Sequence, residues 1–232
     1  MSFVFEPAAT VAVPVAGSDA LFPVRRIYCV GRNYAAHARE MGGDPDREPP
    51  FFFCKPADAI VVVPAGATVD LPYPPQTADY HHEIELVVAI GRTGHDIPVE
   101  RALDHVWGYA VGLDMTRRDL QAKLRDKGRP WELGKAFDAS APISPLHAAA
   151  AVGHPSAGAI WLEVDGQMRQ RGDIEQLIWS VPEVVANLSG YFTLQPGDLI
   201  YTGTPEGVGE VTRGQHLRGG IDGLGELNLR VV

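Results

Sequence analysis

Short apolar runs, separated by prolines and glycines, dominate the pattern of the chain. Runs of this length, rich in β-branched and aromatic residues, are typical of β-strands. We expect strands at 26–31, 59–63, 83–91, 106–114, 159–166, 198–203 and 226–232. The pairs Asp165–Gly166 and Asp222–Gly223 predict hairpin turns. The 19 prolines and 25 glycines favour many strands joined by short turns.

Helical patterns are fewer. The segments with such a pattern are 33–42, 116–128 and 180–192. Thr116 and Asp119 have the spacing of a capping box at the start of the second segment. Ser180 is the expected N-cap of the third, with Glu183 at its third position. A few helices among many strands predict an α+β fold that is mainly β.

Two glutamates interrupt the apolar run 83–91. Because side chains alternate along a strand, Glu83 and Glu85 share one face with Val87 and Ala89. At the usual rise per residue the two carboxylates lie about 7 Å apart along the strand, where they repel each other and lose hydration. A hard divalent cation would offset this cost, because it prefers carboxylate oxygens as ligands. The run therefore predicts a metal site at its start.

A third oxygen ligand is expected from another element, and Asp114 is the best match. It ends the apolar run 106–114 just before a helical segment, where an aspartate alone is an ordinary helix cap. Together with the two glutamates it favours a three-carboxylate site. His81 and His82 keep a softer zinc or iron site open, although no H-x-H or H-x-x-x-H pair completes it.

Composition narrows the class of protein. The 232 residues suffice for one large β-rich domain or two small ones. A formal net charge of −9 argues against nucleic acid or an anionic membrane as a partner. Only two cysteines occur, Cys29 and Cys54, which argues against a disulfide framework. The N-terminus lacks a basic signal-peptide region and no apolar run is long enough to span a bilayer, so we expect a cytoplasmic protein.

Six separated motifs extend this picture: GRNYAAHAREMG, KPADAIV, HHEIELVVAIG, GYAVGLDMTRRDLQ, GKAFDASAPISP and YTGTPEGVG. They occur in the order seen in the fumarylacetoacetate hydrolase family, which the chain resembles from about residue 25 onward, and most of all in its acylpyruvase and fumarylpyruvate hydrolase branch. The resemblance implies a mixed β-sandwich roll with a few outer helices, and usually a homodimer. One catalytic domain would span 1–232, with 1–24 as an N-terminal extension and 25–232 as the core.

The resemblance also implies a metal site and an acid/base pair. Glu83, Glu85 and Asp114 match the metal-ligand carboxylates, which would bind Mg²⁺ or Mn²⁺, with Ca²⁺ as an alternative. His37 and Glu40 match a pair on a short helix that closes over the substrate. At a spacing of three residues the two share one helix face, so that His37 can take a proton from water while Glu40 orients the imidazole.

Four further residues match the family's substrate contacts. Lys135 in GKAFD matches an active-site lysine, which would place a positive charge on a carbonyl or an oxyanion. Arg118 and Gln121 match contacts on the helix after the metal aspartate. Thr204 matches a residue that binds the substrate carboxylate. Its motif YTGTPEGVG lacks the G-K-[ST] ending of a phosphate-binding loop, so we expect a turn with exposed N–H groups.

The implied activity is metal-dependent hydrolysis of the carbon–carbon bond of a 2,4-dioxo acid, preferably fumarylpyruvate, to fumarate and pyruvate. Oxaloacetate decarboxylation and isomerisation of 2-hydroxyhepta-2,4-diene-1,7-dioate stay open, since the same metal site serves all three. His37 and Glu40 favour hydrolysis, which needs a water-activating pair. An iron dioxygenase and a non-catalytic binding protein are alternatives from other classes. Residues 33–50 are expected to form a mobile lid.

Overall fold

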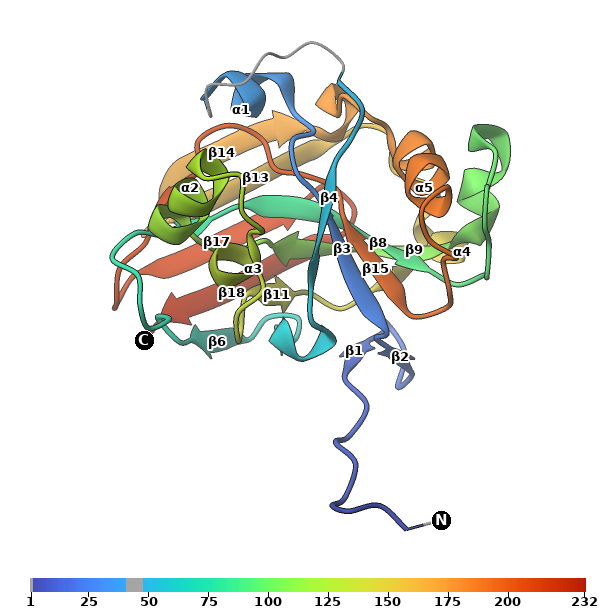
Figure 1. The fold of residues 1–232 in the computed structure, drawn as a ribbon, viewed down its shortest axis with the longest axis horizontal. Coiled ribbons are helices and arrows are strands. Elements are labelled where there is room, and N and C mark those ends of the chain that lie inside the picture. The colour runs from blue at the N-terminus through green and yellow to red at the C-terminus, as the bar shows by residue number, and fades with distance from the viewer. Residues whose placement is uncertain (1, 41–47) are drawn as a thin grey trace.

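The computed structural model describes residues 2–40 and 48–232, and of residues 38–40 it describes the backbone alone. A strongly curved eight-stranded sheet packs against a five-stranded sheet, and the α-helices lie around the outside (Figure 1). The expected α+β fold, mainly β, is confirmed. Of the predicted lid 33–50, residues 41–47 lie outside the described residues, and the lid stays a prediction.

The larger sheet is mixed and supplies the strands that carry the site. Strand β3 runs parallel to β15 and β11 runs parallel to β5, whereas the other neighbours are antiparallel. In spatial order the strands are β4 (Phe52–Lys55), β3 (Arg26–Val30), β15 (Asp198–Tyr201), β8 (Ile84–Ile90), β9 (Val106–Leu113), β11 (Ala141–Ile143) and β5 (Ile60–Val62), with β12 (His147–Ala148) also beside β9.

The other sheets complete the roll. The five-stranded sheet has the order β14 (Gln167–Asp173), β13 (Ala159–Val164), β17 (His216–Ile221), β18 (Gly225–Val231) and β6 (Thr68–Leu71). Two small sheets are formed by β10 (Thr116–Arg117), β7 (Tyr80–His82) and β16 (Gly209–Glu210), and by β1 (Ala12–Pro14) and β2 (Leu21–Pro23). Both predicted hairpins are confirmed. Asp165 and Gly166 have φ of 51° and 74°, the left-handed values that a tight hairpin turn requires.

The helices are short. They are α1 (Ala35–Glu40), α2 (Arg118–Asp126), α3 (Glu132–Lys135), α4 (Ala149–Val152) and α5 (Val181–Ser189), with 3₁₀ turns η1 (Ala57–Ala59), η2 (Val99–His105) and η3 (Ile174–Gln176). The predicted start of α5 is confirmed, because the Glu183 carboxylate accepts hydrogen bonds from the N–H and hydroxyl of Ser180. The first predicted helix is α1, and residues 41 and 42 of that prediction lie outside the described part.

The predicted capping box at the start of α2 is wrong. Helix α2 begins at Arg118, because Thr116 and Arg117 pair with β7 as strand β10. The Thr116 hydroxyl instead donates to the carbonyl of Asp114 at 3.1 Å and lies 3.3 Å from Glu83 Oε1. Thr116 therefore supports the site rather than the helix.

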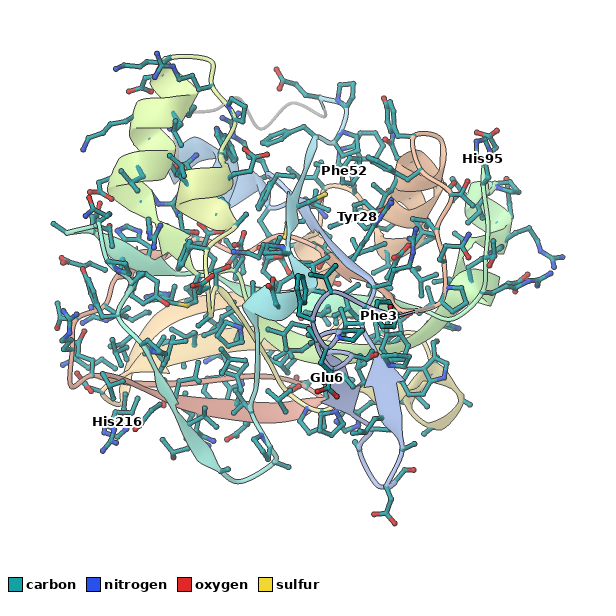
Figure 2. The ribbon with its side chains drawn as sticks, turned by 60° about the horizontal axis from the view of Figure 1, so that its bottom comes forward. Phe3, Glu6, Tyr28, Phe52, His95 and His216 are labelled. Atoms are coloured by element: carbon teal, nitrogen blue, oxygen red, sulfur yellow. The ribbon has the colours of Figure 1, made fainter. Side chains whose placement is uncertain are left out.

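Strand β8 separates two apolar cores. Ile84, Leu86 and Val88 face the core between the two large sheets, where Phe52 also packs near Tyr28 (Figure 2). Val87 and Ala89 face a second core, which β1 and β2 cover. The predicted alternation along the run is confirmed, and burial on both faces fixes the register, since a slip of one residue would exchange the two sets.

Two expectations about the rest of the chain can be compared with the structure. Cys29 is buried in β3 and Cys54 is exposed in β4, and both are free thiols, as expected without a disulfide framework. Across residues 2–40 and 48–232, every helix is too short or too polar to cross a membrane.

Candidate active site

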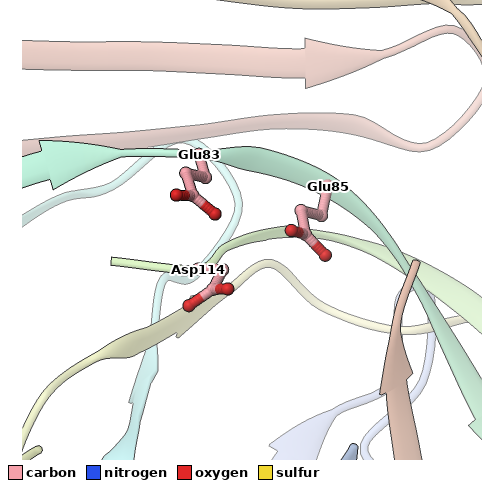
Figure 3. A group of neighbouring side chains, drawn as sticks. All are labelled: Glu83, Glu85 and Asp114. Carbon is pink, nitrogen blue, oxygen red and sulfur yellow. The ribbon is translucent and has the colours of Figure 1, made fainter. Parts of the chain in front are cut away.

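Two neighbouring strands bring three carboxylates together. Glu83 immediately precedes β8, Glu85 lies in β8, and Asp114 immediately follows β9. The Asp114 N–H donates to the Glu83 carbonyl at 2.9 Å, which holds the two strand ends side by side. One oxygen from each carboxylate lies within 4.8 Å of the others, and all three side chains are buried (Figure 3). Three converging hard oxygen donors fit a divalent cation such as Mg²⁺ or Mn²⁺.

Three cationic side chains neutralise this group. Lys135 Nζ lies 2.8 Å from Glu83 Oε2 and 2.7 Å from Asp114 Oδ2. Arg118 forms an ion pair with Glu83 Oε1. Lys55 Nζ lies 2.8 Å from Asp114 Oδ1, although not in the direction of a hydrogen bond. A divalent cation held by the carboxylates would take over part of this role as counter-charge.

Glu85 differs from Glu83 in its electrostatics. In the described part of the chain no cationic group pairs with Glu85, and its Oε2 accepts a hydrogen bond of 2.8 Å from the Gly203 N–H. Burial and the charges of Asp114 and Glu83 raise the pKa of Glu85 well above its usual value. Burial also raises the pKa of Glu83, but its two cationic partners outweigh this and hold the pKa below its usual value. A cation bound by the three carboxylates would favour the charged form of Glu85 and so oppose this rise in its pKa.

The turn that supports Glu85 requires a glycine. Gly203 has φ of 102°, and a Cβ there would lie 2.7 Å from the Cβ of Asn33. The Asn33 amide donates to the carbonyls of Thr202 at 2.8 Å and Trp179 at 2.9 Å, and its oxygen accepts from the Trp179 N–H at 2.7 Å. These bonds fix the turn after β15 to the segment that leads into α1. The turn is followed by β16 and not by a helix, as expected for a motif that is not a phosphate-binding loop.

A small cavity beside Glu83 gathers most of the predicted catalytic and substrate-binding side chains. Its lining consists of Gly31, Arg32, His37, Glu83, Arg118, Gln121, Arg125, Trp131 and Lys135. Its volume is about 20 Å³, room for about one water molecule. A substrate therefore needs the lining side chains to move. A larger cavity of about 190 Å³ lies elsewhere, among Leu103, Tyr109 and His154, and none of the predicted site residues lines it.

Of the predicted catalytic and substrate-binding residues with described side chains, Thr204 alone does not line this cavity. Glu40 ends α1, and its side chain lies outside the described part of the structure. Thr204 is buried next to the turn that supports Glu85, and its hydroxyl accepts a 2.8 Å hydrogen bond from Gln170 Nε2. The site residues that the structure brings together at the cavity are thus His37, Glu83, Arg118, Gln121 and Lys135.

The two histidines before the metal strand have partners other than the carboxylate group. His81 Nε2 lies 2.7 Å from Asp79. Burial lowers the pKa of His82 to about 4, so its ring is neutral at pH 7. Its Nδ1 lies 2.8 Å from Gln170 Oε1, which also accepts from the Ile84 N–H at 3.1 Å. The Gln170 oxygen can only accept, so Nδ1 carries the proton. Only the three carboxylates group as metal ligands in the described residues.

Sequence reasoning missed Arg32 and Arg125, which line the cavity, and two buried residues that support the site. Lys55 lies at the end of β4, is buried, and hydrogen-bonds to the carbonyls of Met115, at 3.2 Å, and Lys135. A lysine at the end of an apolar run, within the motif KPADAIV, was the signal. Gln170 lies in the mostly polar strand β14, where no pattern distinguishes it from its exposed neighbours.

Comparison with known proteins identifies the family. The family model described as fumarylacetoacetate (FAA) hydrolase, C-terminal, matches residues 26–232. The chain belongs to the fumarylacetoacetate hydrolase family. The crystal structure of fumarylpyruvate hydrolase from Pseudomonas aeruginosa in complex with Mn²⁺ and pyruvate superposes with a TM-score of 0.98 at 68% identity, covering 100% of this chain and 99% of that one.

Relatives named for two different activities are similar to this chain in sequence. Fumarylpyruvate hydrolase of Ralstonia sp is 48% identical over 188 residues, 81% of this chain and 95% of that protein. The mitochondrial oxaloacetate tautomerase FAHD1 of Arabidopsis thaliana is 44% identical over 206 residues, 89% of this chain and 90% of that protein. The predicted family membership is confirmed, and the fold alone does not select among these activities.

Proposed function

We propose that the protein is a divalent-metal-dependent hydrolase that cleaves the carbon–carbon bond of 2,4-dioxo acids, with fumarylpyruvate as its preferred substrate. The observation that carries this proposal is the buried group of three carboxylates beside a cavity lined by His37 and several cationic side chains. The likeness to a fumarylpyruvate hydrolase crystallised with Mn²⁺ and pyruvate supports it.

Glu83, Glu85 and Asp114 would hold the cation, which is Mg²⁺ or Mn²⁺, and the same oxygens could bind Ca²⁺ in its place. When bound, the cation supplies Lewis-acid stabilisation for the negative charge that develops on the 2-oxo acid half of the substrate. The surrounding protein keeps bulk water away from the three carboxylates, because all three are buried.

His37 is the proposed general base. It lies on α1 and lines the cavity together with Glu83, so that a water molecule there is within reach of its ring. Attack of this water on the 4-carbonyl breaks the bond between carbons 3 and 4. The acyl half leaves as a carboxylic acid and the other half as the pyruvate enolate, which takes up a proton to give pyruvate. Glu40, three residues after His37 on α1, is proposed to orient the imidazole.

Cationic and amide groups would bind the rest of the substrate. Lys135 Nζ is already held against Glu83 and Asp114, so its charge lies at the centre of the site and can stabilise an oxyanion. The Arg118 Nη1 donates to Gln121 Oε1 at 3.1 Å, which orients both side chains toward the same ligand. Thr204 is proposed to bind the pyruvate carboxylate, as the resemblance implies.

A second function has support from the relatives. Oxaloacetate tautomerases and an oxaloacetate decarboxylase of Dictyostelium discoideum are 41 to 44% identical to this chain. Enolisation and decarboxylation both use a metal site of this kind. Neither reaction consumes a water molecule, but tautomerisation also moves a proton, so a base at His37 suits a hydrolase and a tautomerase alike and the choice depends on the substrates turned over.

The test is turnover of a small panel by the purified protein. Fumarylpyruvate, acetylpyruvate and enol- and keto-oxaloacetate are supplied with Mg²⁺ or Mn²⁺, and again after treatment with EDTA. We expect metal-dependent loss of the diketone absorbance with one pyruvate formed per acylpyruvate consumed. Turnover of oxaloacetate alone would contradict the proposal and favour the second function. Light scattering of the same sample tests the homodimer that the resemblance implies.

A further inference from the structure

We propose that Arg32 binds a second carboxylate, at the far end of the acyl group, and thereby makes the enzyme selective for acylpyruvates that are dicarboxylates. This inference rests on the proposed function, and it identifies the terminal carboxylate of the acyl group as the feature of the substrate that the site recognises. It concerns the part of the cavity lining that Arg32 and Trp131 form.

The first observation is the charge of the cavity lining. Among the described side chains, four permanently cationic residues line it, Arg32, Arg118, Arg125 and Lys135, together with one carboxylate, Glu83. Arg118 and Lys135 already pair with Glu83. The two remaining arginines leave a positive excess in a protein whose formal net charge is −9. A positive excess inside an acidic protein favours an anionic ligand at that place.

The second observation separates the two remaining arginines. Arg125 pairs with the neighbouring Asp126 at 3.0 Å. The guanidinium of Arg32 has no acidic partner among residues 2–37 and 48–232, and its contact is with the ring of Phe51, 5.8 Å from the ring centroid. Within the described part of the lining, Arg32 is therefore the arginine whose planar fork is not paired with an acidic side chain and is suited to a ligand carboxylate.

The third observation is that Arg32 is held in place by both of its neighbours in the chain. The Gly31 N–H donates to the Phe51 carbonyl at 3.0 Å, and a Cβ on Gly31 would come within 1.9 Å of the Phe51 ring. On the other side, the Asn33 side chain makes the three hydrogen bonds to Trp179 and Thr202 described above. A guanidinium presented from such a fixed backbone segment loses little entropy when it binds.

The fourth observation is a row of aromatic rings that joins the two ends of the site. Lys135 Nζ lies 5.1 Å from the Phe53 ring centroid, and Phe53 lies 5.8 Å from Trp131. Trp131 lies 5.5 Å from Phe51, edge to face, and Phe51 contacts Arg32. The row runs from the metal-binding end to Arg32. A flat unsaturated acyl chain would lie along these rings with its terminal carboxylate at the guanidinium.

This arrangement selects against a neutral acyl group. An acetyl group ends before the row does and leaves Arg32 partly desolvated without a partner, which costs binding energy. A trans-unsaturated acyl chain that ends in a carboxylate satisfies both the rings and the guanidinium. Hydrogen bonds to a charged group change affinity by about 10- to 150-fold, which sets the size of the expected effect.

The kinetic test compares Arg32→Gln and Arg32→Lys with Arg101→Gln as a matched control. Arg101 is exposed on η2 and paired with Asp104, so its substitution removes the same charge far from the cavity. For Arg32→Gln we expect kcat/KM on fumarylpyruvate to fall by about 10- to 100-fold, mainly through KM, and on acetylpyruvate by less than about three-fold. Arg32→Lys should lie between wild type and Gln. An equal loss on both substrates, or none, overturns the inference.

A binding test separates failure of this inference from failure of the proposed function. Fumarate and crotonate have the same planar carbon skeleton, but crotonate has a methyl group in place of one carboxylate. In calorimetry with Mn²⁺-loaded protein we expect fumarate to bind at least about ten-fold more tightly than crotonate, and Arg32→Gln to abolish the difference. If no acylpyruvate is turned over, the proposed function fails while this ratio still decides the role of Arg32. A wild-type ratio near one overturns the inference, and matching melting temperatures exclude misfolding of the variant.

Discussion

The two sides of the active-site cavity are built in different ways. On the metal side, the three carboxylates come from the ends of adjacent antiparallel strands, and Glu83 and Asp114 have buried lysine partners. The acyl side is the part of the lining formed by the loop residue Arg32 and by Trp131, which immediately precedes α3. The ring of Phe51 contacts both of these residues. The metal side is fixed by the sheet, whereas the acyl side depends on single side chains.

This difference explains how related proteins can share a fold and differ in substrate. Replacing Glu83, Asp114 or one of their lysine partners leaves a buried charge without one of its partners, which is costly. A residue on the acyl side can change with little effect on folding, because it packs at the edge of the cavity and takes no part in the buried ion pairs just described. Relatives named as a hydrolase and as oxaloacetate tautomerases are both similar to this chain, and we attribute their different substrates to the acyl side.

Replacing His37 removes the proposed general base and leaves the three carboxylates in place. His37 lines the cavity but is not one of the grouped carboxylates. For His37→Asn we expect kcat on fumarylpyruvate to fall by about 10²- to 10⁴-fold, because a general base is lost. Mn²⁺ affinity, measured by calorimetry, should stay within about two-fold of wild type. A variant that retains full kcat would contradict the assignment of His37 as the base.

Replacing Lys55 tests how much of the metal side depends on charge pairing. For Lys55→Met we expect the free energy of unfolding, measured by urea denaturation of metal-free protein, to fall by about 3–5 kcal/mol, because a buried ion pair with Asp114 is broken. The exposed Lys123 on α2 provides the control, since Lys123→Met removes the same charge from the surface. Equal stability of the two variants would show that the Lys55 pair contributes nothing net.

A smaller, pH-dependent effect is expected at Asp119, on the helix that carries Arg118. Burial raises the pKa of Asp119, but hydrogen bonds from the Thr77 hydroxyl and the N–H groups of Leu120 and Ala78 outweigh this and lower it. Because this pKa is lower in the folded than in the unfolded chain, the ionised carboxylate stabilises the fold at pH values above the ordinary carboxyl pKa of about 4. This stabilisation is lost as the pH falls through the pKa of the folded state.

We therefore expect Asp119→Asn to lower the free energy of unfolding by about 1 kcal/mol at pH 7 and by less at pH 3. Asp19→Asn, in the exposed turn between β1 and β2, should show no such change with pH. Urea denaturation at the two pH values measures both. If Asp119→Asn lowers the free energy of unfolding by the same amount at both pH values, the depressed pKa of Asp119 is not the cause.

The sequence predicted the metal side well because its signal is local. Alternation along one strand placed Glu83 and Glu85 on the same face, and the end of the next strand supplied Asp114. Buried strands of this kind fold as their pattern indicates, since both faces pack against apolar cores.

The acyl side and the supporting residues could not be predicted in the same way. Gln170 connects His82 to Thr204 across 34 to 88 residues of sequence, and no local pattern encodes such contacts. Thr116 has the spacing of a helix cap, but pairing with β7 takes priority over that local preference. Which aromatic residues meet is decided by tertiary packing, which composition does not reveal.

The most direct test of the account is calorimetric titration of metal-free protein with Mn²⁺, for wild type and Glu85→Gln. Glu226, exposed and paired with Arg218, provides the matched control as Glu226→Gln. We predict one Mn²⁺ per chain for wild type and for Glu226→Gln, and at least about 100-fold weaker binding for Glu85→Gln, because a ligand is lost. Equally tight binding to Glu85→Gln would contradict the assignment of the three carboxylates as the metal site.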